Sequence, residues 1–344
     1  MKNSDILKLV RPNIMRMEPY SCARSEFKGE ARIFLDANEN PYGTYNRYPD
    51  PLQVAIKDKI AKIKGVRPGQ IMLGNGSDEP IDLIYRIFCR PGVDNVVAIE
   101  PSYGMYRVAA ETNDVEYRVA MLDADFNFDA DAMLAEADAS TKVAWLCSPN
   151  NPTGNALPED QIRKILDSFG GIVVIDEAYI DFASRPGWLR ELDRHPRLIV
   201  LQTFSKAWGL AGVRCGMAFA SEEIIDIFNK VKYPYNVNTL TQEAVSRALD
   251  EAEATATRVR GILDERERVV RQLGSLPLIR RIYPTDANFI LVKVDDANAV
   301  YSALLNSGIV TRNRNKVSLC AGCIRVTIGT PAENDALIAK LKTL

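Results

Sequence analysis

The chain has 344 residues, of which 47% are hydrophobic and 26% are charged, and its formal net charge is −2. That balance is typical of a soluble globular protein of about two domains. No long basic tract is present, which argues against nucleic acid or a membrane surface as the main partner. No apolar run could cross a bilayer, and residues 1–16 lack the apolar core of a secretory signal. We therefore expect a cytoplasmic protein that acts on small molecules.

Six cysteines and one histidine limit the metal and acid–base chemistry of the chain. Cys320 and Cys323 form a Cys-x-x-Cys without a second pair to complete a zinc site, so we expect two reduced thiols near a strand. His195 lies in a turn-like segment, Asp193 to Arg197, before an apolar run. We therefore expect a lysine to carry out the acid–base work.

The first two thirds of the chain predict an N-terminal arm followed by an α/β domain. Residues 1–30 show no clear hydrophobic period and predict an arm with one short helix. Across residues 31–238, apolar runs that predict buried strands alternate with amphipathic segments such as 159–169, a predicted helix. The predicted strands are 95–99, 143–147, 172–175 and 198–201. This alternation predicts a large domain with a mostly parallel sheet sandwiched between helices.

The last third, residues 239–344, predicts a smaller α+β domain. Residues 239–273 are rich in Ala, Glu and Arg and predict one long linking helix that ends at Gly274. Short strands are predicted at 288–294 and 324–328, together with two helices. Thr330-Pro331-Ala332-Glu333 predicts the start of the last helix, because it combines a capping box with proline at the first helical position.

The first segment with recognisable chemistry is Leu73-Gly74-Asn75-Gly76-Ser77-Asp78-Glu79. Ser77 is a good N-cap for the amphipathic helix that follows. The amides of Gly76, Ser77 and Asp78 would then point at an anion, with help from the helix dipole. A plain turn before a helix explains this segment alone equally well.

Two further segments follow predicted strands, at the sheet edge where ligands of parallel sheets bind. In Ser148-Pro149-Asn150-Asn151-Pro152-Thr153-Gly154, the Asn151 amide can donate to a phenolate oxygen, although a plain turn would also explain it. In the other segment, Asp176 ends a buried strand, where a carboxylate is costly unless it is paired. A pyridinium N–H is one suitable partner, and Tyr179 could then bond the ring hydroxyl. The alternative is a helix-capping aspartate with a core tyrosine.

The last chemical segment, Thr203 to Gly216, follows the strand predicted at 198–201. The Lys206 amine can form a Schiff base with an aldehyde cofactor, while Ser205 and Arg214 hold its phosphate. An exposed Ser-Lys pair in a solvated loop is the alternative. A phosphate cradle, an amide donor, a carboxylate and a lysine, in that order and at strand ends, together point to pyridoxal 5′-phosphate.

The pattern resembles the fold-type I pyridoxal phosphate enzymes, and specifically the histidinol-phosphate aminotransferase family. The resemblance runs from about residue 19 to the C-terminus. It is carried by the segments 35–43, 47–50, 102–106, 176–182, 205–216, 308–312 and 323–330. It implies a ping-pong aminotransferase that converts imidazole acetol phosphate and L-glutamate to L-histidinol phosphate and 2-oxoglutarate. The amino group would pass through pyridoxamine phosphate, in histidine biosynthesis.

The resemblance also implies a role for each matching residue. Lys206 would carry the cofactor and shuttle a proton. The phosphate of the cofactor would be held by the Gly76, Ser77 and Asp78 amides, Ser205 and Arg214, and its ring by Tyr103, Asn151, Asp176 and Tyr179. Tyr48 would reach the cofactor of a neighbouring subunit, which implies a homodimer.

The substrate would be held by a second group of residues. The resemblance implies that Arg325 binds its anionic end, beside Asn151, and that Tyr20 and Arg312 grip its phosphate. It gives no role to Arg314 or Lys316.

Three alternatives remain open at this point. The first is an aromatic amino acid aminotransferase, and the second is a lyase like the threonine-phosphate decarboxylases. The third is a cofactor-binding regulator without activity. The presence of Asp176, Lys206, Arg214 and Arg325 argues against the regulator, which would not need a proton shuttle.

Overall fold

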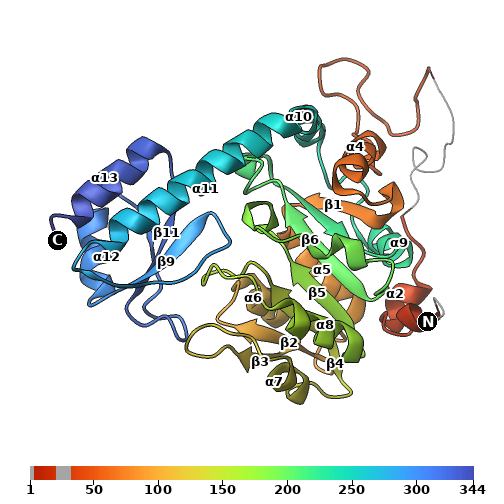
Figure 1. The fold of residues 1–344 in the computed structure, drawn as a ribbon. Helices are drawn as coiled ribbons and strands as arrows, with labels where there is room; N and C mark the ends of the chain where they lie inside the picture. The colour runs from red at the N-terminus through yellow and green to blue at the C-terminus, as the bar shows by residue number, and fades with distance from the viewer. Residues whose placement is uncertain (1–3, 21–31) are drawn as a thin grey trace.

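The computed structural model describes residues 4–20 and 32–344. Figure 1 shows a large sheet surrounded by helices and, at the other end of the molecule, a small sheet reached through α10 and α11. The described residues of the predicted arm contain α1 (Ser4–Leu7) and α2 (Pro12–Arg16), one helix more than the sequence indicated, and residues 1–3 and 21–31 lie outside the described range. None of the described helices is long and apolar enough to cross a membrane.

The large sheet has seven strands in the order β1-β7-β6-β5-β4-β2-β3. Their bounds are β1 (Ile71–Asn75), β2 (Asn95–Glu100), β3 (Glu116–Met121), β4 (Thr141–Cys147), β5 (Ile172–Asp176), β6 (Leu198–Thr203) and β7 (Cys215–Phe219). Only β7 is antiparallel to its neighbours β1 and β6, so the prediction of a mostly parallel sheet is confirmed. The four predicted strands correspond to β2, β4, β5 and β6, whose side chains are almost all buried.

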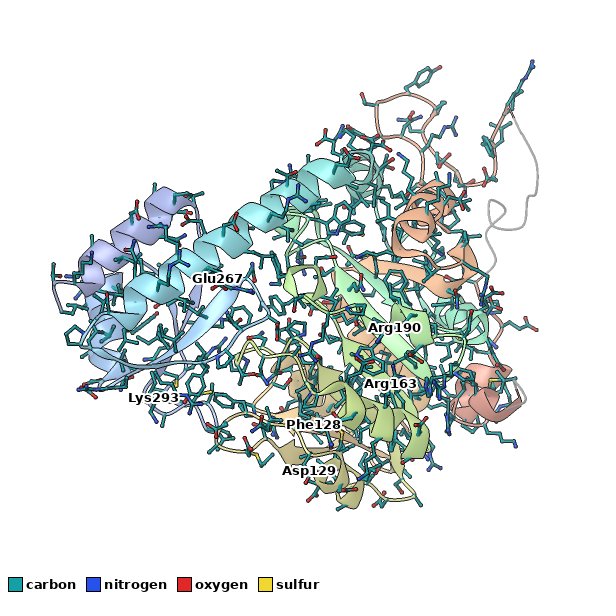
Figure 2. The ribbon with its side chains drawn as sticks, in the orientation of Figure 1. Phe128, Asp129, Arg163, Arg190, Glu267 and Lys293 are labelled. Atoms are coloured by element: carbon teal, nitrogen blue, oxygen red, sulfur yellow. The ribbon has the colours of Figure 1, made fainter. Side chains whose placement is uncertain are left out.

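Amphipathic helices surround this sheet. They are α4 (Val54–Lys64), α5 (Asp78–Phe88), α6 (Met105–Thr112), α7 (Ala130–Ala135), α8 (Glu159–Ser168) and α9 (Glu222–Val231). The helix predicted at 159–169 is α8, which buries Ile162, Ile165 and Leu166 against the sheet. The short 3-10 helices of this part are η1 (Pro68–Gln70), η2 (Ile180–Phe182), η3 (Trp188–Glu191) and η4 (Ala211–Val213). Arg163 of α8 and Arg190 of η3 lie close together in Figure 2 because both pair with Glu159 at 2.7 Å.

The small sheet is antiparallel throughout, with the order β10-β11-β9-β8. Its strands are β8 (Ile279–Ile282), β9 (Phe289–Val294), β10 (Arg312–Asn313) and β11 (Cys323–Thr327), and the helices α12 (Ala297–Leu305) and α13 (Pro331–Leu341) accompany it. The predicted capping box of α13 is confirmed. The Thr330 amide donates to the Glu333 carboxylate at 2.7 Å, and the Thr330 hydroxyl accepts from the Glu333 amide.

The prediction of one linking helix over residues 239–273 was wrong in one respect, because this segment forms two helices. α10 (Thr239–Asp250) and α11 (Ala252–Gly274) are separated at Glu251, which has a non-helical backbone (φ −105°, ψ 31°). α11 then contributes Val259 to the core of the large sheet, and Val269 to the core of the small sheet. One helix therefore connects two hydrophobic cores. The domain boundaries near residues 30 and 238 stay predictions.

Candidate active site

A cavity of about 510 Å³ lies at the carboxyl ends of β4, β5 and β6, where the small sheet faces the large one. Most of the residues predicted for the site line it, from both sheets. They are Ser77, Asp78, Tyr103, Asn151, Asp176, Tyr179, Ser205, Lys206, Arg214, Arg312 and Arg325. The structure therefore brings together, in one space, segments that are more than 200 residues apart in the sequence.

The start of α5 forms one wall of the cavity. Ser77 is its N-cap residue by position, as predicted, but its side chain makes no capping hydrogen bond and lines the cavity instead. The prediction of three free amides was wrong for Gly76, whose amide donates to the carbonyl of Arg214 at 3.1 Å. The amides of Ser77 and Asp78 remain at the helix start, where the dipole favours an anion.

Arg214 closes the same wall from the other side. Its Nη1 lies 3.5 Å from the Ser205 hydroxyl, and its Nη2 lies 3.4 Å from the Asp78 carboxylate. The Arg214 backbone is left-handed (φ 56°), a strained conformation that occurs often at functional sites. Gly76 permits this approach, because a Cβ there would lie 2.6 Å from the Arg214 Nη2. Two hydroxyls, two amides and a guanidinium thus surround a space suited to a phosphate.

Asp176 ends β5 at the floor of the cavity and is only 2% exposed. Its carboxylate accepts one hydrogen bond from the Ala178 amide at 3.0 Å and another from the Tyr106 hydroxyl at 2.7 Å. Burial raises the pKa of Asp176, while the bond from Tyr106 opposes that rise. Within the described part of the chain, Asp176 forms no ion pair. A buried carboxylate of this kind is suited to a cationic N–H from a ligand.

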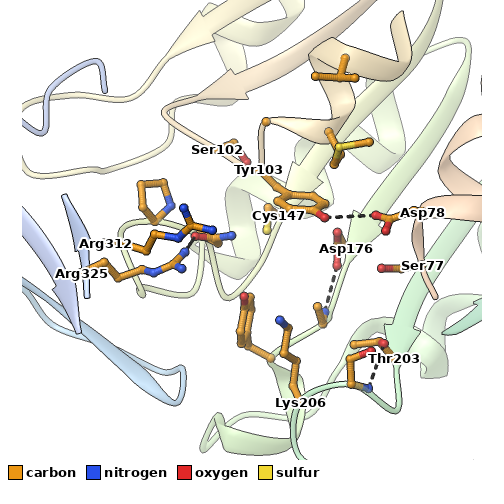
Figure 3. Close-up of a pocket in the computed structure, with 18 of the residues that line it drawn as sticks. Ser77, Asp78, Ser102, Tyr103, Cys147, Asp176, Thr203, Lys206, Arg312 and Arg325 are labelled. Carbon is orange, nitrogen blue, oxygen red and sulfur yellow. Dashed lines mark hydrogen bonds between the residues drawn. The ribbon is translucent and has the colours of Figure 1, made fainter. Parts of the chain in front are cut away.

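Lys206 extends toward the cavity from the loop after β6 (Figure 3). Its ammonium lies 5.5 Å from the centre of the Tyr179 ring. Burial lowers the pKa of Lys206, and the positive charge of Arg325 lowers it further, although the negative charge of Asp176 opposes this. A larger fraction of the amine is therefore neutral, the form that acts as a nucleophile or base.

The small sheet supplies another wall of the cavity. Arg312 of β10 and Arg325 of β11 are directly opposite each other in the antiparallel ladder. Their side chains therefore leave the sheet on the same face, and Figure 3 shows both reaching into the cavity. The Arg325 Nη1 donates to the side-chain oxygen of Asn151, and its guanidinium lies 5.1 Å from the centre of the Phe289 ring. This arrangement offers two cations to the far end of a bound molecule.

Residues 26–341 match the family model for aminotransferase class I and II. The chain belongs to this family. It is 57% identical to the "Histidinol-phosphate aminotransferase" of Parabacteroides distasonis, over 99% of each chain. Its fold is similar to that of a histidinol-phosphate aminotransferase from Sinorhizobium meliloti solved with pyridoxal-5′-phosphate (TM-score 0.80, 24% identity, 89% of each chain covered). It is also similar to L-threonine-O-3-phosphate decarboxylase from Porphyromonas gingivalis (TM-score 0.75, 24% identity), with 87% of this chain and 90% of that chain covered.

Two tyrosines predicted for the site of this aminotransferase do not line its cavity. Tyr20 is 76% exposed. Tyr48 stacks on Tyr235, with ring centres 4.4 Å apart, and lines a separate cavity between residues 44–56 and α10. Their roles stay predictions, and within one chain they do not join the other site residues.

Sequence reasoning gave no role to Tyr106 and Arg314, which the structure places at the site. Tyr106 is fully buried, donates to Asp176, and stacks on Trp145 with ring centres 4.8 Å apart. Its signal in the sequence was its position three residues after Tyr103, which precedes α6 and whose ring meets the Tyr106 ring edge-on with centres 5.6 Å apart. Arg314 lines the cavity, and its signal was the spacing of two residues from Arg312, which in an extended chain places both side chains on one face.

Proposed function

We propose that this aminotransferase uses pyridoxal 5′-phosphate to transfer the amino group of L-glutamate to imidazole acetol phosphate, forming L-histidinol phosphate and 2-oxoglutarate. This reaction belongs to histidine biosynthesis. The relative from Parabacteroides distasonis, 57% identical over 99% of the chain, supports the proposal. So does a cavity that combines an amine, a buried carboxylate, a phosphate cradle and two arginines.

The residues of the cavity fit this cofactor. Its phosphate would be held by the Ser77 and Asp78 amides, Ser205 and Arg214, and its ring by Tyr103, Asn151, Asp176 and Tyr179. Asp176 provides the test of fit, because a carboxylate that is 2% exposed and forms no ion pair among the described residues would be stabilised by a cationic partner, and a protonated ring nitrogen is one. The bound cofactor would supply an aldehyde and a ring that withdraws electrons from the substrate Cα.

The side chains of the protein would then do the acid–base and binding work. The neutral Nζ of Lys206 could accept the proton that the substrate Cα loses and deliver it to the C4′ carbon of the cofactor. The negative charge of Asp176 would stabilise the protonated form of the cofactor ring nitrogen, and so keep the proton on that nitrogen. Arg325 would orient the substrate through its anionic end, since a planar guanidinium binds a carboxylate or a phosphate through two parallel hydrogen bonds.

The observation that carries the choice of substrate is the pair Arg312 and Arg325, opposite each other in the ladder and open to the cavity. Among the ion pairs of the described residues, none includes either arginine. Two cations on one face repel each other unless an anion lies between them. A phosphate, with up to two charges and three terminal oxygens, satisfies both.

We also propose a homodimer in which Tyr48, and with it Tyr20, completes the site of the second copy. Both side chains lie away from the cavity of their own chain. Sedimentation of the holoenzyme, combined with activity at decreasing protein concentration, tests this. A monomer with full activity would rule it out.

A single half-reaction on the holoenzyme tests the proposed function. Histidinol phosphate, phenylalanine and threonine phosphate are added separately while the absorbance of the bound cofactor is followed. Fast conversion with histidinol phosphate, and much slower conversion with phenylalanine, is the expected result. A preference for phenylalanine would favour an aromatic aminotransferase, and release of carbon dioxide from threonine phosphate would favour a decarboxylase. Arg325→Leu should weaken the binding of both glutamate and histidinol phosphate, and loss of glutamate binding alone would contradict a shared anion site.

A further inference from the structure

Arg314 extends the arginine pair of the small sheet by one more position. The ladder pairs Arg312 with Arg325 and Asn313 with Ile324, and the Arg314 amide continues it by donating to the carbonyl of Cys323 at 2.9 Å. Because side chains alternate along a strand, Arg312 and Arg314 leave on the same face. Asn313 points the other way, where its amide donates to Asn298 at 2.8 Å. Three guanidinium groups therefore face the cavity.

The three arginines have no acidic partner within the described part of the chain. No ion pair there includes Arg312, Arg314 or Arg325, and the buried Nε atoms of Arg314 and Arg325 have no hydrogen-bond acceptor. The pKa of Arg314 is lowered by burial and by the charge of Arg312. The pKa of Arg325 is lowered by burial and then by the charge of Arg314. Like charges that lie together without an anionic partner destabilise one another, most of all the partly buried Arg314 and Arg325, and an anion in the cavity would reduce that cost.

We propose that Arg314 is a specificity-determining residue that binds the phosphate of the substrate and so makes the site prefer a phosphate over a carboxylate. This inference rests on the proposed function. A carboxylate has one charge and two oxygens, which a single guanidinium such as that of Arg325 can satisfy through two parallel bonds. A phosphate has up to two charges and three terminal oxygens, and therefore has places for further guanidinium groups. Arg314 should thus matter for histidinol phosphate and inorganic phosphate, and much less for glutamate.

The test compares Arg314→Gln with Lys316→Gln in the holoenzyme. Lys316 follows two residues later on the same segment, is exposed, and does not line the cavity, so its variant removes the same charge without removing a contact. Three quantities are measured for wild type and each variant. They are the concentration of histidinol phosphate and of glutamate that gives the half-maximal half-reaction rate, and the inhibition constant of inorganic phosphate.

For Arg314→Gln, we expect the half-maximal concentration of histidinol phosphate and the inhibition constant of inorganic phosphate to rise about tenfold or more. This is the usual effect of losing one charge-assisted hydrogen bond. The value for glutamate and the maximal rates should change by about twofold or less, since uniform binding is removed without a change in the chemical step. Lys316→Gln should change all values by about twofold or less. Arg314→Lys, which keeps the charge and loses the planar fork, should give intermediate values and guards against a fold defect in the first variant.

The outcomes separate this inference from the proposed function. An equal loss for glutamate and histidinol phosphate, or equal effects of Arg314→Gln and Lys316→Gln, would overturn the role of Arg314 while the function stands. If the wild-type holoenzyme does not convert histidinol phosphate, the proposed function fails, and this inference fails with it.

Discussion

The hydrogen bond from Tyr106 to Asp176 offers a sharp test of how the site works. Tyr106→Phe removes only the hydroxyl that donates to the buried carboxylate at 2.7 Å, and leaves the ring stacked on Trp145. A hydrogen bond to a charged group contributes about 1.5–3 kcal/mol. Because this bond opposes the rise in the pKa of Asp176 that burial causes, its loss should raise that pKa further. At a given pH a smaller fraction of Asp176 should then be in the carboxylate form that pairs with a cationic ring nitrogen.

Tyr85→Phe is the matched control. Tyr85 is also fully buried, stacks on the same tryptophan with ring centres 5.5 Å apart, and donates at 2.7 Å, but to the carbonyl of Tyr106. Both variants should lose roughly 1 kcal/mol or more of unfolding free energy, the usual effect of one buried hydrogen bond. Only Tyr106→Phe should lose activity, by about tenfold in kcat, which corresponds to about 1.4 kcal/mol.

The assay is kcat against pH for the two variants and the wild-type holoenzyme, with the dissociation constant of the cofactor measured in parallel. Activity requires the carboxylate form of Asp176, so a higher pKa should move the acid limb of the profile of Tyr106→Phe to higher pH. If kcat and the acid limb of Tyr106→Phe match those of Tyr85→Phe, Tyr106 has only a packing role and the reasoning is refuted.

Three more predictions concern the lysine, the phosphate cradle and a buried acid. Lys206→Ala should abolish turnover and the visible absorbance of the bound cofactor, and any remaining turnover would remove Lys206 from its role. Gly76→Ala should weaken cofactor binding by about tenfold or more, because its Cβ would meet Arg214. Gly65→Ala is the control, because Gly65 has a similar φ (+69° against +67°) but no atom near the added Cβ, and it should not weaken binding. Equal dissociation constants of the cofactor for the two variants would contradict this prediction. Burial raises the pKa of Glu177 from 4.5 to about 7. The folded state then holds this proton more tightly than the unfolded state, so the contribution of Glu177 to stability falls as pH rises from about 4.5 to 7. The Tm of wild type should decline more steeply across that range than the Tm of Glu177→Gln, and parallel curves would argue against it.

The sequence predicted those parts of the fold and site whose signals are local. The strands β2, β4, β5 and β6 are continuous apolar runs because both of their faces are covered. The predicted cofactor residues Tyr103, Asn151, Asp176, Ser205 and Lys206 lie at or shortly after the ends of these runs, so their position at the sheet edge follows from the strands. β3 was not predicted, because it is an edge strand with partly exposed polar side chains.

Other features depend on contacts between distant segments, which local patterns do not record. The Gly76 amide is taken by the carbonyl of Arg214, 138 positions later in the chain. The hydroxyl of Tyr106 meets Asp176 across the sheet, at a separation of 70 residues. The break at Glu251 carries no proline or glycine, and the helix that follows it, α11, contacts both cores. In each case the information lies in the tertiary fold.

The two sheets divide the work of the proposed site, and the loop after β4 is one of the segments of the large domain that contact the small sheet. The residues proposed to hold the cofactor belong to the large domain, while Arg312 and Arg325 belong to the small sheet. The loop after β4 is bound to the small sheet at its far end, where the Asp286 amide donates to the carbonyl of Gly154 at 2.8 Å. At its near end, Asn151 accepts from Arg325. A change in the position of Arg325 on binding an anion must therefore move or release Asn151, a side chain proposed to bond the cofactor ring. If the proposed roles of Arg325 and Asn151 hold, we expect recognition of the substrate anion and orientation of the cofactor to be coupled through the Asn151 amide.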